Sequence, residues 1–351
     1  QVILPSEEYT ACWDARTRNA RWVVERVNID TVSGSADRRR SRFRVDSRLE
    51  PLFRSNLADY VGSGLDRGHL APAGDHKTNQ DNLTETFLLS NVAPQDPSFN
   101  RGYWSDFEEF VRILVEPTDG GGGSNDAPDT SPPFKNVYVI TGPLFLPSRE
   151  TPSSSFGGSG SGEDAVDADG DGIVDVPKAP DATPADAKWV VKHDIIGNPM
   201  QMVAVPTHFF KVIIAEPYPA ITNTNDNDGV ESSVPTYVAA FAMPNTKIPN
   251  NTDLRNFLVP IEALESVAGM RFLGAAGALD PSERVSLDKQ ALQVREAAGV
   301  GTLAGDWGAR LGSGYRAIEA GRDDGGATTT VGSGKEAAFR HLCTATSCRG
   351  V

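Results

Sequence analysis

The stretch of chain that decides the fold reads GSGLDRGHLAPAGDH from Gly62 to His76 and, after eight further residues, ETFLLSNVAPQDPSFNRGYWSDFEE from Glu85 to Glu109. Residues 87–92 form a short apolar run, which predicts a strand. Within residues 100–115, apolar side chains recur at 104, 107, 111 and 114, which is helical spacing. Pro97 is expected to prevent an earlier helix start. The stretch therefore predicts strand, strand and helix in succession.

This order of elements brings His69 and Asn100 onto neighbouring elements, and both are residue types that phosphodiester hydrolysis uses. A neutral His is a suitable general base because its ordinary pKa lies near physiological pH. A hard divalent cation accepts an Asn side-chain oxygen as a ligand and retains several waters. Spacing alone leaves the structural alternatives open, in which His69 is a satisfied core residue and Asn100 is a helix N-cap.

Other segments predict the rest of the architecture. Short β-branched or aromatic runs predict strands at 22–27, 137–141, 189–191 and 209–215, and helices are expected at 260–267 and 286–298. Strands scattered before and after helices favour an α+β fold with mixed antiparallel sheets flanked by helices.

Three motifs together resemble the DNA/RNA non-specific endonuclease family, whose active site is a ββα-metal finger. They are the DRGH sequence at 66–69, the SNVAPQ run at 90–95, and the FNRxxW pattern from Phe99 with a glutamate at 108. The likeness extends over about residues 9–115 and 136–273 and is greatest to the endonuclease G group of that family.

The resemblance implies a role for each core position. His69 would deprotonate the attacking water, Asn100 would be the direct protein ligand of Mg²⁺ (with Mn²⁺ as a substitute), and Glu108 would orient water around the metal. Glu108 follows Asn100 by eight residues, which in one helix would separate them by about 12 Å along the axis. The alternative is therefore that Glu108 is a solvated helix residue. Asp66 is expected to brace the hairpin.

The resemblance also implies flanking contacts. Arg67 would contact phosphate, and Asn91 would hold His69 or the metal's waters, with a turn residue as the alternative for Asn91. An upstream arginine of the family falls near Arg40 or Arg42. Arg101 stands where many relatives have Gln, and it would add positive charge near the phosphate.

The charge distribution bears on a nucleic-acid partner. The formal net charge is −14 over 351 residues, and polyanion binders are usually basic. Seven arginines nevertheless lie between residues 38 and 54, whereas eight acids and one Lys lie between 151 and 187. This polarity fits a basic working surface on an acidic body; the alternative is that both stretches are solvated faces.

Three segments of low complexity are expected to be loops or disordered insertions in a single nuclease domain covering residues 1–351: 119–133, 153–186 and 323–334. The second has carboxylates at alternate positions and Gly at the sixth, which is calcium-loop spacing. Its predicted Ca²⁺ ligands are Asp167, Asp169, Asp171 and Asp175. Lys178 takes the place of the usual bidentate Glu, so an acidic spacer is the alternative.

The sequence is therefore interpreted as a sugar-non-specific endonuclease that cuts DNA and RNA and, as the resemblance implies, leaves 5′-phosphate ends. The alternatives are a catalytically silent nucleic-acid-binding relative and a calcium-tuned interaction protein. The resemblance further implies a homodimer and an organellar, mitochondrial, or exported location rather than a cytosolic one. No membrane span is expected, because no run of about 18 apolar residues occurs. Cys343 and Cys348 are close enough to pair, which would leave Cys12 free.

Overall fold

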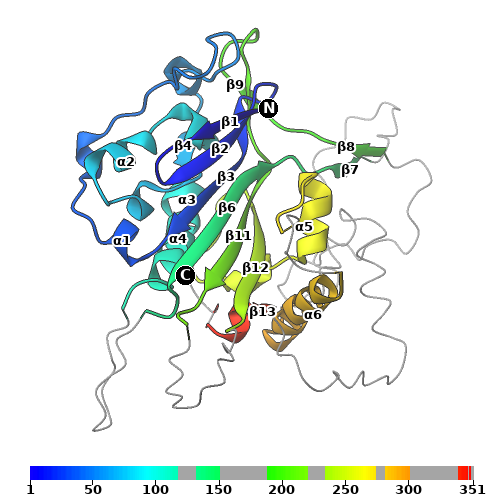
Figure 1. Ribbon diagram of the computed structural model, residues 1–351. Helices are drawn as coiled ribbons and strands as arrows, with labels where there is room; N and C mark the ends of the chain where they lie inside the picture. The colour runs from blue at the N-terminus through cyan, green and yellow to red at the C-terminus, as the bar shows by residue number, and fades with distance from the viewer. Residues whose placement is uncertain are drawn as a thin grey trace, which may run out of the picture.

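The computed structural model describes residues 1–117, 132–150, 188–219, 234–273, 281–300, 339–346 and 348. Its centre is a seven-stranded sheet in the order β1-β2-β3-β6-β11-β12-β13 (Figure 1). All neighbouring strands in it are antiparallel except β12 and β13, which are parallel. The strands are β1 (Val2–Pro5), β2 (Tyr9–Asp14), β3 (Asn19–Val27), β6 (Asn136–Leu144), β11 (His208–Glu216), β12 (Thr236–Pro244) and β13 (Phe339–His341).

Three two-stranded sheets accompany the central one. They pair β4 (Asp66–His69) with β5 (Val92–Gln95), β7 (Ser148–Glu150) with β8 (Lys188–Val190), and β9 (Ile195–Ile196) with β10 (Val203–Ala204). The α-helices are α1 (Ile29–Val32), α2 (Gln80–Glu85), α3 (Pro97–Arg101), α4 (Tyr103–Ile113), α5 (Ile261–Ala268) and α6 (Pro281–Ala297). The 3₁₀ turns are η1 (Arg38–Arg40), η2 (Leu57–Tyr60), η3 (Ala73–Asp75), η4 (Leu89–Asn91), η5 (Leu254–Phe257) and η6 (Leu342–Thr344). The mixed α+β architecture predicted from the sequence is confirmed.

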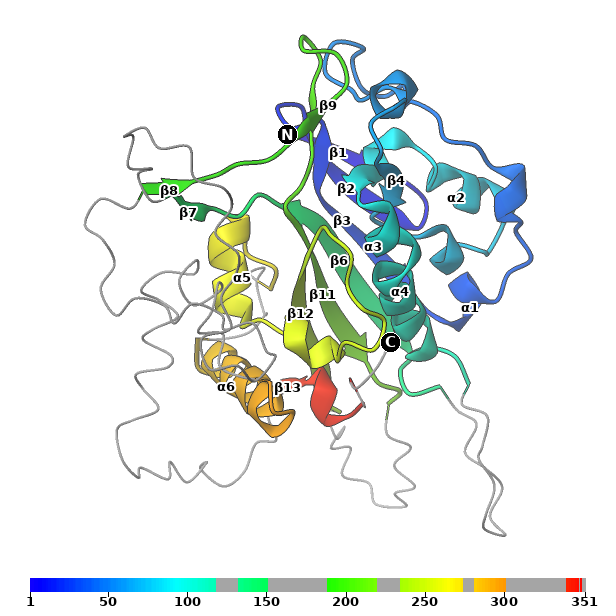
Figure 2. The same ribbon diagram turned by 180° about the vertical axis from the view of Figure 1, so that it is seen from behind.

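Both faces of the central sheet are covered, because its strands carry apolar residues on both sides. Successive side chains of a strand point to opposite faces. In β11, Phe209 and Ile213 pack in one core cluster with Trp104 of α4, while Phe210 and Val212 pack in a second with Leu264 of α5. Seen from behind, α3 and α4 lie against one face, and α5 and α6 lie toward the other side of the sheet (Figure 2). None of the helices in the described part of the chain has the length and apolarity needed to cross a bilayer.

The ββα unit consists of β4, β5 and the helix pair α3–α4, and its boundaries correct two expectations. The predicted strand at 87–92 is wrong: residues 89–91 form η4, and the strand begins at Val92. The helical segment also begins earlier than predicted, because Pro97 occupies the first turn of α3, where its missing N–H costs nothing. Gly102 then separates α3 from α4.

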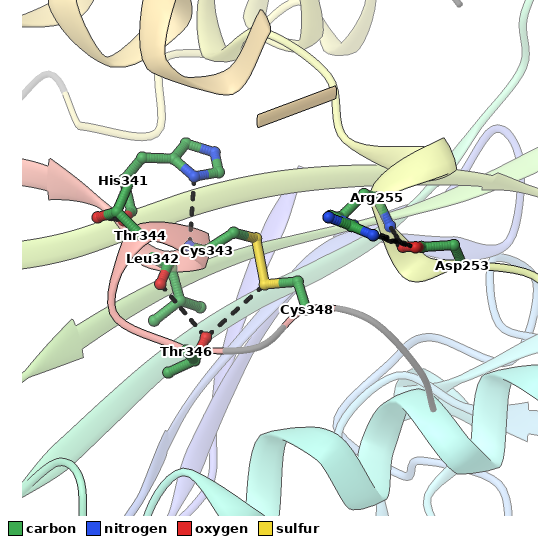
Figure 3. Close-up of a disulfide and its surroundings, with 8 residues drawn as sticks. All are labelled: Asp253, Arg255, His341, Leu342, Cys343, Thr344, Thr346 and Cys348. Carbon is green, nitrogen blue, oxygen red and sulfur yellow. Dashed lines mark hydrogen bonds and ion pairs between the residues drawn. A yellow bond between two sulfur atoms is a disulfide. The ribbon is translucent and has the colours of Figure 1, made fainter. Parts of the chain in front are cut away.

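The C-terminal segment closes one edge of the sheet. β13 adds to β12, and a disulfide joins Cys343 to Cys348 (Figure 3), as the spacing suggested. Cys12 is free and buried. Asp288 of α6 accepts a hydrogen bond of 2.6 Å from the backbone N–H of Ile261, at the start of α5. The insertions predicted at 119–133, 153–186 and 323–334 lie outside the described residues except for 132 and 133.

Candidate active site

His69 is the last residue of β4, opposite Val92 of β5. Its ring packs between two aromatic rings, 5.2 Å from the centroid of Phe43 and 4.8 Å from that of Phe87. The residue is 7% exposed, and its Nε2 is buried with no hydrogen-bond partner among the described residues. An apolar cage of this kind fixes the orientation of the ring and withdraws it from bulk water.

Burial also sets the protonation state of His69. Desolvation is the largest cause that lowers the pKa of His69 to about 3, and the positive charges of Arg38 and His76 lower it further. The imidazole is therefore neutral at physiological pH, which is the form that accepts a proton.

Asn100 lies in α3, opposite the β4 strand. Asp96 caps this short helix by accepting from the backbone N–H groups of Ser98 and Phe99 at 2.8 and 3.0 Å. Asp66 of β4 accepts a hydrogen bond of 2.9 Å from Asn100 Nδ2. With Nδ2 engaged, the amide oxygen of Asn100 is the atom that can face a cation.

Asp66 braces this corner, as expected from the sequence. Besides the bond from Asn100, it accepts bonds of 2.7 and 2.6 Å from the guanidinium of Arg101. Arg101 itself has a side chain that is 71% exposed. One carboxylate thus links the strand that carries His69 to the helix that carries Asn100.

Helix α4 presents a polar face to the same place. Ser105, Glu108 and Arg112 are spaced by three and four residues, so they share one side of the helix. The adjacent side of the helix, about 100° further round, is the buried stripe that the sequence predicted, with Trp104, Phe107 and Val111 each at most 1% exposed.

These elements enclose a pocket of about 340 Å³. Its lining residues are Arg38, His69, Pro72, Ala73, Gly74, Asn100, Arg101, Ser105, Glu108 and Arg112. His69, Asn100 and Glu108 therefore meet in one cavity. The 12 Å rise that separates Asn100 from Glu108 along a helix is not an obstacle here, because Gly102 breaks the helix between them.

Two of the pocket's arginines were missed by the sequence interpretation. The upstream arginine that lines the pocket is Arg38, while the assignment of phosphate contact to Arg40 or Arg42 stays a prediction. A 3₁₀ turn has three residues per turn, so consecutive arginines of η1 point in different directions. Arg42 instead donates to the backbone oxygens of Arg39 and Ser41 at 2.7 and 2.9 Å.

Arg112 is the second missed residue, and helical spacing would have found it, because it follows Glu108 by four residues. It donates to Asp75 across 3.0 Å. With Arg38 and Arg101, it gives the pocket three guanidinium groups.

Two predicted residues lie beside the pocket rather than in it. Arg67 shares a face of β4 with His69 but stacks on Phe43, 4.7 Å from the ring centroid. Asn91 is fully buried, and its amide bonds only to backbone: its oxygen accepts from Ala71 N, and its nitrogen donates to the oxygens of Ala71 and Thr86, all within 2.9 to 3.0 Å. These bonds fix the chain just after His69, and the role of Asn91 in holding His69 or metal waters stays a prediction.

The residues present suit a hydrated divalent cation. Asn100 and Glu108 offer oxygen donors, which hard cations prefer. Desolvation raises the pKa of Glu108 to about 8 despite the nearby charge of Lys211, so this carboxylate lacks a sufficient counter-charge. Among the described residues, no three of His, Cys, Asp and Glu gather to hold a metal. The calcium residues predicted at 167–175 lie outside the described residues.

Comparison with known proteins gives consistent matches. A sequence model described as DNA/RNA non-specific endonuclease matches residues 1–277. Mitochondrial endonuclease G of Homo sapiens is 37% identical over 277 residues, covering 78% of this chain and 71% of that protein. The mitochondrial nuclease of Saccharomyces cerevisiae is 35% identical over 286 residues, covering 81% and 68%. A solved structure of an EndoG/EndoGI complex superimposes with a TM-score of 0.56 at 32% identity, covering 77% of this chain and 84% of that one.

Proposed function

This chain belongs to the DNA/RNA non-specific endonuclease family, and we propose that it cleaves both nucleic acids by a one-metal mechanism with His69 as general base. The family consists of metal-dependent nucleases, so the chain is a nuclease. The observation that supports the mechanism is the convergence of His69, Asn100 and Glu108 on one pocket lined by three arginines.

The chain's own residues divide the work of hydrolysis. The neutral ring of His69 accepts the proton of the attacking water. Arg38, Arg101 and Arg112 bind and orient the scissile phosphate, whose negative charge they match. Asn100 would hold the cation through its amide oxygen, and Glu108 would accept hydrogen bonds from its waters. When bound, the cation supplies positive charge at the phosphoryl group, and Mg²⁺ is the proposed ion, with Mn²⁺ as a substitute.

The experiment that tests this mechanism is cleavage of plasmid DNA and of a structured RNA, with Mg²⁺ and with chelator, by the wild type and by His69→Ala. The wild type should cut both substrates, leave 5′-phosphate ends, and stop on chelation. His69→Ala should bind duplex normally and lose at least about 10²-fold in rate. Near-normal nicking by the variant would remove His69 from the mechanism.

Substrate binding is tested separately on the inactive His69→Ala protein. Its affinity for duplex DNA should fall steeply as salt rises, because arginine–phosphate contacts release counterions. A flat salt dependence would contradict the assignment of the arginines to phosphate.

We also propose that the protein forms a homodimer and works in an organelle or outside the cell. Support for the location comes from the similar nucleases of Homo sapiens and Saccharomyces cerevisiae, both named mitochondrial. Light scattering of the purified protein tests the first proposal, with a monomeric mass contradicting it. Cell fractionation tests the second, with a cytosolic signal contradicting it.

A further inference from the structure

His76 is a buried residue that the hydrolysis steps above do not use. Its side chain is 0% exposed, and both ring nitrogens face carboxylates. Nδ1 lies 3.0 Å from Glu8 Oε2, and Nε2 lies 2.8 Å from Glu25 Oε2. A neutral imidazole has one donor and one acceptor nitrogen, so it would set a lone pair against one carboxylate. An imidazolium has two N–H donors and satisfies both carboxylate oxygens at once, so this geometry favours the charged ring.

The two carboxylates come from a different part of the fold. Glu8 lies between β1 and β2, and Glu25 lies in β3 with 3% exposure. The ring of Tyr9 in β2 packs edge-on against His76 at 5.8 Å. His76 thus fastens the turn after His69 to the β1–β3 side of the central sheet.

The same turn builds one wall of the catalytic pocket. Pro72, Ala73 and Gly74 line the pocket directly. The next residue, Asp75, holds Arg112 at 3.0 Å, and a Cβ placed on Gly74 would lie 3.0 Å from that guanidinium. Asn91 fixes the start of this turn through hydrogen bonds to the backbone of Ala71. His76 fixes its end through the contacts with Glu8 and Glu25.

The charges around the ring also favour the imidazolium. Glu8, Glu25 and Asp75 all act on His76, while Arg112 lies beside Asp75, and Glu108 and Lys211 are the next charges. Burial, the largest cause, and the charge of Glu25 raise the pKa of Asp75. Burial disfavours a charged ring, but the bonds to Glu25 and Glu8 outweigh it and raise the pKa of His76 to about 10.

We propose that His76 is a positioning residue for cleavage, a buried imidazolium that ties the turn after His69 to the central sheet and so holds the pocket wall and Arg112 in register. This inference rests on the proposed function. Misplacement of reacting groups by about 1 Å can cost about 10²-fold in rate. The loss should fall mainly on kcat, because His76 does not line the pocket and acts through the orientation of Arg112 and of the pocket wall.

The test compares His76→Gln with His341→Gln as a matched control. His341 is also buried, at 2% exposure, but lies on β13 and does not line the pocket. Steady-state cleavage of a short duplex is measured at saturating Mg²⁺, with each protein held equally far below its own Tm. His76→Gln should lose at least about 10-fold in kcat with KM changed less than about 3-fold. His341→Gln should keep the wild-type kcat.

The other possible kinetic results either overturn or support the positioning role of His76. Wild-type kcat in His76→Gln, or an equal loss in His341→Gln, would overturn the positioning role. If His76→Gln does not fold, Glu8→Gln replaces it, because Glu8 is the more exposed partner at 12%. A kcat loss of at least about 3-fold at constant KM would then support the role, and an unchanged kcat would overturn it. His69→Ala in the same assay separates the two proposals, since full activity there would refute the proposed function on which this inference depends.

Discussion

The stability of the protein should depend on pH, because the pKa of His76 differs between the unfolded and the folded state. The ordinary pKa is 6.5, and the folded protein raises it to about 10. Below pH 6.5 both states carry the proton, and the full stabilisation is present. As the pH rises from 6.5 toward 10, the folded state keeps the proton and the unfolded state loses it, so stability falls. The slope is about 1.4 kcal/mol per pH unit, and the total loss is ~5 kcal/mol.

Urea unfolding at pH 6.5, 7.5 and 8.5 measures this slope. The reference is the double variant His76→Gln/Glu25→Gln, which leaves an amide pair in place of the buried ion pair. The free energy of unfolding of the wild type, minus that of the double variant, should fall by about 2.3 kcal/mol over these two pH units, because the unfolded ring is half protonated at pH 6.5. The m-values should stay equal, so that the difference reports stability alone.

His341→Gln serves as the control for this experiment. Burial lowers the pKa of His341 to about 4, so above pH 6.5 this ring is neutral in both states and its replacement should give a constant difference. Parallel stability curves for the wild type and the His76 double variant would show that the His76 ring is not charged in the folded protein. The reasoning from its two carboxylate contacts would then be refuted.

Three further outcomes are expected. Asn100→Ala should raise the Mg²⁺ concentration for half-maximal cleavage at least about 10-fold, as measured by metal titration; titration curves that overlay the wild type would place the metal elsewhere. Arg38→Ala should lower kcat/KM by about 10²-fold, whereas Arg40→Ala should change it less than about 3-fold; similar losses in both would contradict the assignment of Arg38 to the pocket. Cys343→Ser should lower the free energy of unfolding by about 2 kcal/mol, given the short loop that the disulfide closes. Plasmid cleavage by that variant should be unchanged, and urea curves that match the wild type would show that the bond does not stabilise the fold.

Local patterns in the sequence determined much of the catalytic unit. The apolar spacing at 104, 107 and 111 predicted the buried side of α4 because a helix repeats every 3.6 residues. The motifs at 66–69 and 99–108 singled out His69, Asn100 and Glu108, which all line the pocket. The prediction of a strand at 87–92 was wrong, because a segment that is buried on all sides is apolar whether or not it is a strand. Phe87 packs on His69, and residues 89–91 form a 3₁₀ turn.

Tertiary structure decided the features that depend on distant parts of the chain. The orientation of the short 3₁₀ turn η1 decides which of its arginines faces the pocket. Sequence spacing alone therefore could not predict that it is Arg38 and not Arg40. His76 meets Glu8 and Glu25 across 68 and 51 residues, and no local periodicity encodes such a contact. The sequence by itself therefore predicted the pairing of His69 with Asn100 and the buried side of α4. Only the fold decided the protonation of its histidines, because burial and distant charges shift a pKa through space.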